Sequence, residues 1–242
     1  GRIYSDAQVK RIVVENGAAV GVEGEFLNRS THVPRGKFRV DAPVVVIAAG
    51  GIGSADLLLR NFPDEELGKR FYVNPHYMVW ADFGRDIDNQ NSIPCAYAVH
   101  EWRQVRRKPN GEYDSGGYIM LSNHQSPGLF SVMLTEAGQA HTNRMKKYHQ
   151  LGSTMSVIDE DNPGRLYIDR KGIRRADYHV RGIDQLKAID YLKNASRIFL
   201  AAGATEVWIP DIYGTVVRNE RDIEAKIQLR SVQPNAQFCP GS

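Results

Sequence analysis

The spacing of hydrophobic and polar positions changes several times along the chain. Between residues 8 and 27, β-branched residues alternate with polar ones on both sides of Asn16-Gly17. This dipeptide supplies the positive φ values that a two-residue turn needs, so the stretch predicts a β-hairpin. Residues 37–40 predict a further short strand.

A continuous apolar run follows from Val44 to Ala49. Such a run is typical of a strand that is buried on both faces, as in a parallel sheet covered by helices. A leucine-rich helix is predicted after it, with Ser54 as its cap and Asp56 in its first turn.

From about Phe83 onward, short β-rich runs alternate with Gly, Pro, Asn and Asp clusters. Repeated short strands at this spacing predict an antiparallel sheet. A helix is expected within residues 137–151. The predicted strands lie in residues 77–83, 93–100, 116–122, 128–135 and 152–158.

The last third of the chain predicts a hairpin and two helices. The hairpin spans residues 164–180, with Lys171-Gly172 as its turn. The clearest helix of the chain is expected to begin at Asp184 as its cap and to close at Gly203, and another is expected near Asn219. The fold class is therefore α/β plus an antiparallel sheet, that is α+β. We expect three regions: 1–80, 81–180 and 181–242.

Composition narrows the possible functions. Of the 242 residues, 42% are hydrophobic and 24% charged, which is typical of a globular protein. The net charge is only +3, and the densest basic stretch, residues 102–109, is short, so no nucleic-acid partner is expected. No apolar run approaches the ~20 residues of a membrane span. The histidines and the two cysteines lack metal-ligand spacing, and no metal is expected.

The glycines after the apolar run raise the question of a dinucleotide site. Gly51 and Gly53 match the first two glycines of G-x-G-x-x-G, but Asp56 stands at the third. A carboxylate there would face the pyrophosphate, which is unfavourable. The loop is therefore not the primary phosphate-binding loop. It is either a turn of small residues between strand and helix or a secondary contact.

Several segments in order resemble the glucose-methanol-choline (GMC) family of FAD oxidoreductases, in particular its long-chain alcohol oxidase and cholesterol oxidase branches. They cover most of the chain. The family's usual His-Pro is replaced by Asn74-Pro75-His76. The similar segments are "VKRIVVENGAAVGVE", "APVVVIAAGGIGSADLLLRN", "LGKRFYVNPH", "DNPGRLYIDRKG" and "YHVRGIDQLKAIDYLKNASRIFLAAGATEVW".

The resemblance implies FAD as cofactor, with residues 1–80 as part of the FAD-binding domain and 181–242 as a helical return toward it. A plain strand valine, tight strand-helix packing and a structural histidine are the alternatives to cofactor contact. The residues that the resemblance places near the cofactor are Val9, Ala49, Gly50, Gly51 and His76.

In the family, one face of the antiparallel sheet covers the substrate cavity, so residues 81–180 are expected to bind substrate. An apolar, Met-rich lining suits an apolar alcohol. Alternation places Tyr118 and Met120 on one face without saying which, and the helices behind the sheet are the alternative neighbours. The candidate pocket residues are Tyr118, Met120, Phe130 and Met133.

The resemblance therefore implies an FAD-dependent oxidoreductase that acts on a small-molecule alcohol, apolar or sugar-like. The electron acceptor is either oxygen or another carrier. The family's primary glycine loop and its catalytic histidine motif are expected outside these 242 residues, so no catalytic residue is assigned here and the isolated chain is expected to be inactive. The alternatives are a non-catalytic substrate-domain remnant or interaction module, and another FAD-dependent class such as a monooxygenase.

Overall fold

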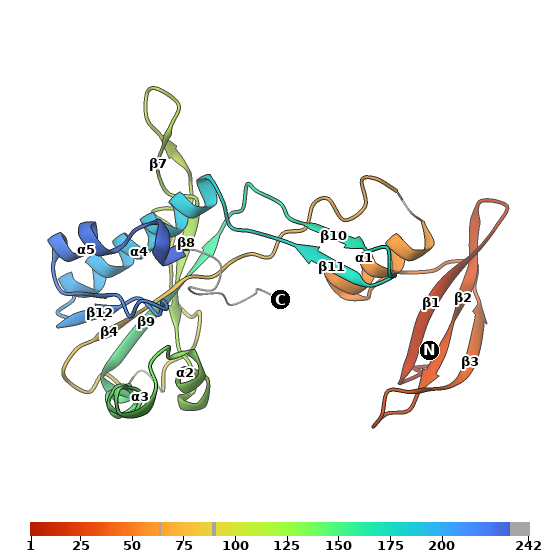
Figure 1. The fold of residues 1–242 in the computed structure, drawn as a ribbon, viewed down its shortest axis with the longest axis horizontal. Helices are drawn as coiled ribbons and strands as arrows, with labels where there is room; N and C mark the ends of the chain where they lie inside the picture. Colours follow the sequence, from red (N-terminus) through yellow and green to blue (C-terminus); the bar gives the residue numbers. More distant parts are fainter. Residues whose placement is uncertain (63, 89–90, 233–242) are drawn as a thin grey trace. The chain divides into compact units, whose positions relative to one another are not determined.

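The computed structural model describes residues 1–62, 64–88 and 91–232 (Figure 1). The closing segment 237–242, with Cys239, lies outside the described residues. The chain divides into two compact units: residues 1–71 with 163–178, and residues 72–162 with 179–242. The described residues form helices together with several antiparallel sheets, which confirms the α+β class.

The first unit is built on a three-stranded antiparallel sheet in the order β1-β2-β3. Asn16 and Gly17 have φ values of 52° and 79°, so the predicted hairpin turn is confirmed. The hairpin around Gly172 is confirmed as well. The elements are β1 (Ala7–Glu15), β2 (Ala18–Leu27), β3 (Pro34–Asp41), α1 (Gly50–Asn61), β10 (Arg165–Ile168) and β11 (Arg174–Asp177).

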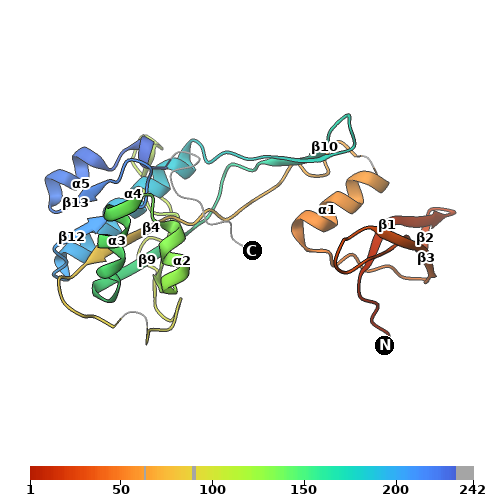
Figure 2. The ribbon, with the colours of Figure 1, turned by 60° about the horizontal axis from the view of Figure 1, so that its bottom comes forward.

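Helix α1 packs beside β1 and β10 (Figure 2). Asn61 at its end joins it to the sheet, because its Oδ1 accepts from Ile12 N–H at 2.9 Å and its Nδ2 donates to the Lys10 carbonyl at 3.3 Å. Arg60 donates to the Gly172 carbonyl at 3.1 Å, which links the helix to the β10–β11 turn.

Two expectations for this unit were wrong. The run Val44–Ala49 is not a strand; Val44 is 71% and Val46 82% exposed. A strand needs backbone partners, and no described residue pairs with this run. The predicted cap at Ser54 is also wrong, because α1 begins four residues earlier at Gly50; the Ser54 hydroxyl instead accepts from Ala49 N–H at 3.2 Å.

The second unit is built on a six-stranded antiparallel sheet in the order β13-β12-β4-β9-β8-β5. A small hairpin, β6–β7, and several helices complete it. The strands are β4 (Met78–Asp82), β5 (Ala98–Val99), β6 (Arg106–Arg107), β7 (Tyr113–Ser115), β8 (Tyr118–Asn123), β9 (Leu151–Ile158), β12 (Glu206–Trp208) and β13 (Val216–Val217). The helices are α2 (Pro127–Met133), α3 (Gly138–Lys146), η2 (Tyr148–Gln150), α4 (Ile183–Ala201), α5 (Glu220–Lys226) and η3 (Leu229–Val232).

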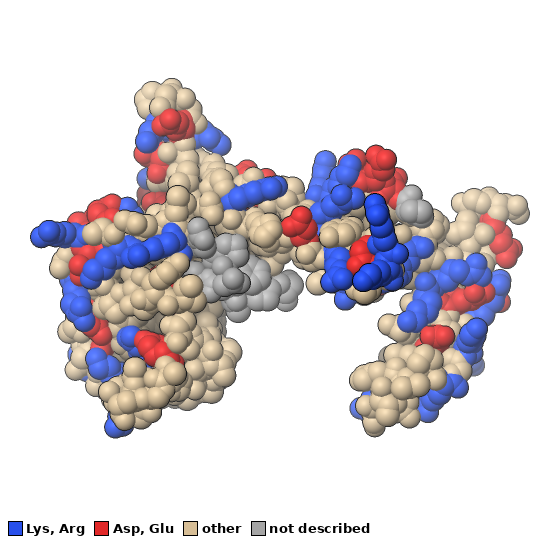
Figure 3. Space-filling model, viewed as in Figure 1, with Lys and Arg blue, Asp and Glu red and all other residues tan. Residues whose placement is uncertain are grey.

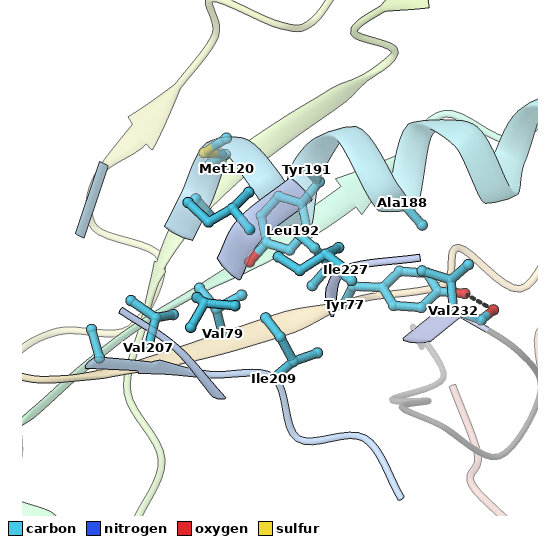
Figure 4. Packing of buried hydrophobic residues seen from close by; sticks show 14 of the residues in the cluster. Tyr77, Val79, Met120, Ala188, Tyr191, Leu192, Val207, Ile209, Ile227 and Val232 are labelled. Atoms are coloured by element: carbon cyan, nitrogen blue, oxygen red, sulfur yellow. Dashed lines mark hydrogen bonds between the residues drawn. The ribbon is translucent and has the colours of Figure 1, made fainter. Parts of the chain in front are cut away.

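The two faces of this sheet are covered differently. Helices α4 and α5 lie on one face and α2 and α3 on the other (Figure 1). On the α4 face, Val79 and Met120 pack with Tyr191 and Leu192 of the helix (Figure 4). On the other face, Trp80 packs with Phe130, Leu151 and Trp208.

The helix ends show which capping predictions succeed. The helix start predicted near Asn219 is confirmed, since α5 begins at Glu220; the structure adds that the Asn219 side chain caps it by accepting from Asp222 N–H at 2.9 Å. Gly203 follows the end of α4 with a φ of 96°, also as predicted. Asp184 is not the cap of α4, which begins at Ile183 after Gly182.

The division into units does not follow the expected boundaries at residues 80 and 180. Helix α4 packs on the sheet of the second unit through Ala188, Tyr191 and Leu192. The hairpin β10–β11, expected with the substrate sheet, belongs to the first unit.

Candidate functional site

The side of β8 that was expected to line a pocket is in the core. Tyr118 and Met120 do share one face, as alternation predicts, but that face lies under α4. The ring of Tyr118 is 1% exposed and meets Tyr191 edge to face at 5.7 Å. Its hydroxyl donates to Asp190 at 3.0 Å, and burial raises the pKa of Tyr118. The side chains of Tyr118 and Met120 therefore pack in the core under α4. Tyr118 is also among the residues that line the cavity described below, and a substrate role for the two residues stays a prediction.

Phe130 and Met133 lie on a helix and not on the predicted strand at 128–135. Ser126 caps α2 through Leu129 N–H at 3.4 Å, and Pro127 occupies its first turn. Proline is favoured there because the first helical N–H groups have no partner within the helix. Phe130 is fully buried, with its ring 4.5 Å from that of Trp80. It therefore belongs to the core.

The candidate site is on the opposite face of the sheet, formed by the residues that alternate with Tyr118 and Met120 along β8 and by their neighbours on β9. Ile119 and Leu121 of β8 pair with Val157 and Met155 of β9, and all four side chains are only partly buried. Met155 also pairs with Met78 of β4, which is buried. We call these residues (Met78, Ile119, Leu121, Met155 and Val157) the open sheet face.

His76 belongs to the same face. Ser156 N–H donates to the Tyr77 carbonyl at 2.8 Å, so the pairing with β9 extends beyond the start of β4. Tyr77 points to the α4 face (Figure 4), and alternation places His76 and Met78 on the opposite one. Nε2 of His76 is buried and has no hydrogen-bond partner among the described residues. Burial lowers the pKa of His76.

A cavity of about 640 Å³ lies at one end of the open sheet face. Strands β8 and β9 contribute Tyr118, Ile119, Val157 and Ile158 to its lining. The chain before β4, the loop between β5 and β6 and the segment after β9 contribute the rest. Sequence reasoning missed it because two of its walls come from loops with no regular pattern. The polar side chains that line it are those of Tyr72, Asn74, Arg103, Gln104, Asp159 and Glu160.

The other predicted cofactor residues lie in the first unit. Val9 is half-buried on β1, where it pairs with Gly24. Ala49, Gly50 and Gly51 lie exposed at the start of α1. A Cβ at Gly50 or Gly51 would meet nothing within 4 Å, so space is open at this helix end.

A buried charge cluster holds the start of α4 against the end of β9. Lys187, which is 1% exposed, pairs with Asp184 at 3.2 Å and Asp161 at 2.5 Å. Asp184 also accepts from the backbone N–H groups of Asp161 and Asn162. The spacing of Asp184 and Lys187 was the available signal, but their burial depends on the fold. Lys187 and Asp184 thus find their partners within the second unit, and we interpret the cluster as structural.

Charges of both signs are interspersed on the face of the molecule that Figure 3 shows. Within the described ranges, no group of three or more His, Cys, Asp or Glu side chains is arranged to hold a metal ion. Among the same residues, no helix is both long enough and apolar enough to cross a membrane.

No protein-family model matches the chain, and no curated protein matches it.

The burial of His76 predicts a pH dependence of stability. Because its pKa is lowered in the folded state, the unfolded chain binds the proton more tightly, and stability is lost as the pH falls below the ordinary value of 6.5. His76→Gln should flatten the dependence of the unfolding free energy between about pH 7 and pH 5. Urea titrations at several pH values measure it.

His100→Gln is the matched control, because His100 is exposed. This variant should keep the slope of the native chain. An unchanged slope in His76→Gln would mean that other groups set the pH dependence.

Proposed function

We propose that the chain is part of an FAD-dependent oxidoreductase of the GMC type that acts on CH–OH donors, with its second unit on the substrate side. The observation that carries the proposal is the open sheet face along β8 and β9, which is apolar and adjoins the cavity. It supports the proposal because ligand sites are concave, mostly apolar and provided with a few polar groups. The order of the family-like segments is the second support.

The chemistry that the resemblance implies is removal of the hydroxyl proton by a base and transfer of a hydride to flavin. In this chain, the side chains of Ile119, Leu121 and Val157 would hold the apolar part of the alcohol and exclude water from it. The Nε2 of His76 is buried and has no hydrogen-bond partner among the described residues, and the resemblance places the base in a segment outside this chain. We therefore assign no catalytic base within the described residues.

The first unit offers part of a cofactor site. The start of α1 faces open space at Gly50 and Gly51, and a helix N-terminus favours an anion such as a phosphate. Asp56 would oppose this less than the sequence suggests, because it is paired with Arg60 at 3.1 Å and Arg174 at 3.8 Å. The run Val44–Ala49 beside it, however, is not held in a sheet. The described residues therefore do not make a complete FAD site.

We predict that the isolated chain binds FAD weakly or not at all. One open helix end cannot enclose a pyrophosphate that needs a glycine loop and neighbouring strands. The measurement is the flavin absorbance that remains after incubation with FAD and dialysis. A stoichiometric yellow protein would show that the described residues suffice for the cofactor.

The substrate role of the open sheet face is tested by Leu121→Lys in the product of the complete gene. A cationic side chain at this half-buried position removes apolar contact and repels an apolar ligand, so KM for the preferred alcohol should rise at least about tenfold with kcat less affected. Leu129→Lys, at a residue of α2 that is 48% exposed, is the control and should leave KM unchanged. Equal KM values in both variants would remove the face from the substrate site.

The alternative is a binding module without catalysis. It is favoured by one observation: the imidazole of His76, on the open sheet face, has its Nε2 buried and without a hydrogen-bond partner among the described residues. The two functions differ in one respect: a binding module would hold the alcohol without flavin chemistry.

A further inference from the structure

The cavity at the end of the open sheet face has walls of opposite character. One wall is apolar and continues from Ile119 and Val157 along the sheet to Leu121 and Met155. The remaining lining includes amide, guanidinium and phenol groups on Asn74, Arg103, Gln104 and Tyr72, which we call the polar wall. A ligand that fits both walls is itself amphipathic.

Both polar segments are fixed to the sheet. The Trp102 carbonyl accepts from Tyr118 N–H at 3.1 Å, and the Trp102 ring stacks on that of Tyr118 at 6.2 Å, which anchors the segment that carries Arg103. On the other side, the carboxylate of Glu160 accepts from Val73 N–H at 3.0 Å and Asn74 N–H at 2.5 Å. These contacts hold the backbone of both segments in place beside the sheet.

The polar wall keeps unused hydrogen-bonding capacity. Among the described residues, the side chains of Asn74, Arg103 and Gln104 make no hydrogen bond or ion pair, and neither does the Tyr72 hydroxyl. Together they offer donors and acceptors in several directions, which suits a ligand end that carries more than one hydroxyl group. Asn74 also has a positive φ of 54°, a backbone conformation that asparagine adopts more readily than most other residues.

The charge of the lining disfavours an anion. Arg103 contributes one positive charge, whereas Asp159 and Glu160 contribute two negative charges. A carboxylate or phosphate at this end would meet net repulsion, and a neutral group would not.

We propose that the cavity takes the hydroxyl-rich end of a neutral amphipathic alcohol whose apolar body lies along the open sheet face. The inference rests on the proposed function only in taking this ligand as the substrate. It sharpens the substrate class from any alcohol, apolar or sugar-like, to one that combines both characters.

The test is binding of three neutral probes to the chain: n-octyl β-glucoside below its micelle concentration, 1-octanol and glucose. Calorimetry gives the affinities, and methyl NMR signals of Ile119 and Val157 locate the site. Octyl glucoside should bind saturably and at least about tenfold more tightly than either half, since each half uses one wall only. Octyl sulfate, an anionic analogue, should bind more weakly than octyl glucoside.

Substitutions at three places in the lining assign the walls. Arg103→Ala combined with Gln104→Ala should reduce octyl glucoside affinity to that of octanol and leave octanol binding unchanged. Val157→Asp should weaken both ligands. Arg221→Ala, at an exposed residue of α5, is the control and should change neither. Circular dichroism checks that each variant is folded. Asn74→Gly tests the amide of Asn74 separately, because glycine removes the amide and still adopts the positive φ of this position, and it should weaken octyl glucoside more than octanol.

The proposal is overturned if the Arg103/Gln104 variant binds octyl glucoside like the native chain, or if octyl sulfate binds best. Failure of the proposed function has a different signature. In that case octyl glucoside binds as expected, but the product of the complete gene shows no alcohol-dependent flavin chemistry. If, conversely, the product of the complete gene oxidises alcohols equally well with and without the Arg103/Gln104 change, that result would support the proposed function and overturn the role of the polar wall in substrate binding.

Discussion

Replacing Lys187 by methionine is expected to lower the free energy of unfolding by about 3–5 kcal/mol, the usual cost of breaking a buried ion pair. Methionine keeps the apolar volume of the stem but removes the ammonium group. The carboxylate of Asp184, 3% exposed, would then lose its cationic partner while remaining buried. Urea unfolding followed by circular dichroism measures the loss.

Lys193→Met on the same helix is the matched control. Lys193 pairs with Glu224, whose side chain is 51% exposed, and solvent-exposed pairs contribute only about 0–1 kcal/mol. Similar losses of unfolding free energy in the two variants would mean that burial does not make the pair of Lys187 and Asp184 more important to stability than an exposed pair. Gly117 makes the site sensitive to volume as well, because a Cβ there would lie 2.8 Å from Lys187 Cε.

The second large effect is expected from Leu192→Ala. Leu192 is fully buried between α4 and the sheet, in contact with the largest apolar cluster of the second unit (Figure 4). Truncating a buried leucine costs about 2–5 kcal/mol, through lost burial and the cavity that remains. Thermal and urea unfolding should both show a large loss.

Leu186→Ala separates burial from helix propensity. Both leucines lie on α4, but Leu186 is 42% exposed. Its truncation should change stability by less than about 1 kcal/mol. If the two variants lost the same stability, α4 would not be packed on the sheet through Leu192, and the assignment of this helix to the second unit would be wrong.

Local signals in the sequence were sufficient wherever neighbouring residues decide the structure. Asn16-Gly17 and Asn219 act through their own backbone and side-chain geometry, and both predictions are confirmed. The strand predicted at 128–135 was wrong although Ser126-Pro127 had supplied a local helix start. The apolar content of this stretch does not distinguish a buried helix from a strand.

Features that depend on distant segments could not be predicted. Alternation places Tyr118 and Met120 together, but α4, some 65 residues further along the chain, decides that they are buried and that Ile119 and Leu121 are open. Asp184 was expected as a local cap, whereas it holds residues 161 and 162. The run at Val44 has the composition of a buried strand, and no described segment supplies its partners.

The polar wall of the cavity shows the same limit. Arg103 and Asn74 are separated by some 30 residues and lie in segments without periodicity, so no pattern joins them. Their proximity follows from two separate anchors, Tyr118 N–H to the Trp102 carbonyl and Asn74 N–H to Glu160. Candidate ligand contacts were therefore assigned to the regular strand residues, which the core uses.

The most direct test of the proposed function is anaerobic addition of alcohols to the purified product of the complete gene. We expect a yellow protein whose flavin absorption bands bleach when a neutral amphipathic alcohol is added and return on exposure to its electron acceptor. A flavin that stays oxidised with every alcohol tested, or a purified protein that binds no flavin, would contradict it.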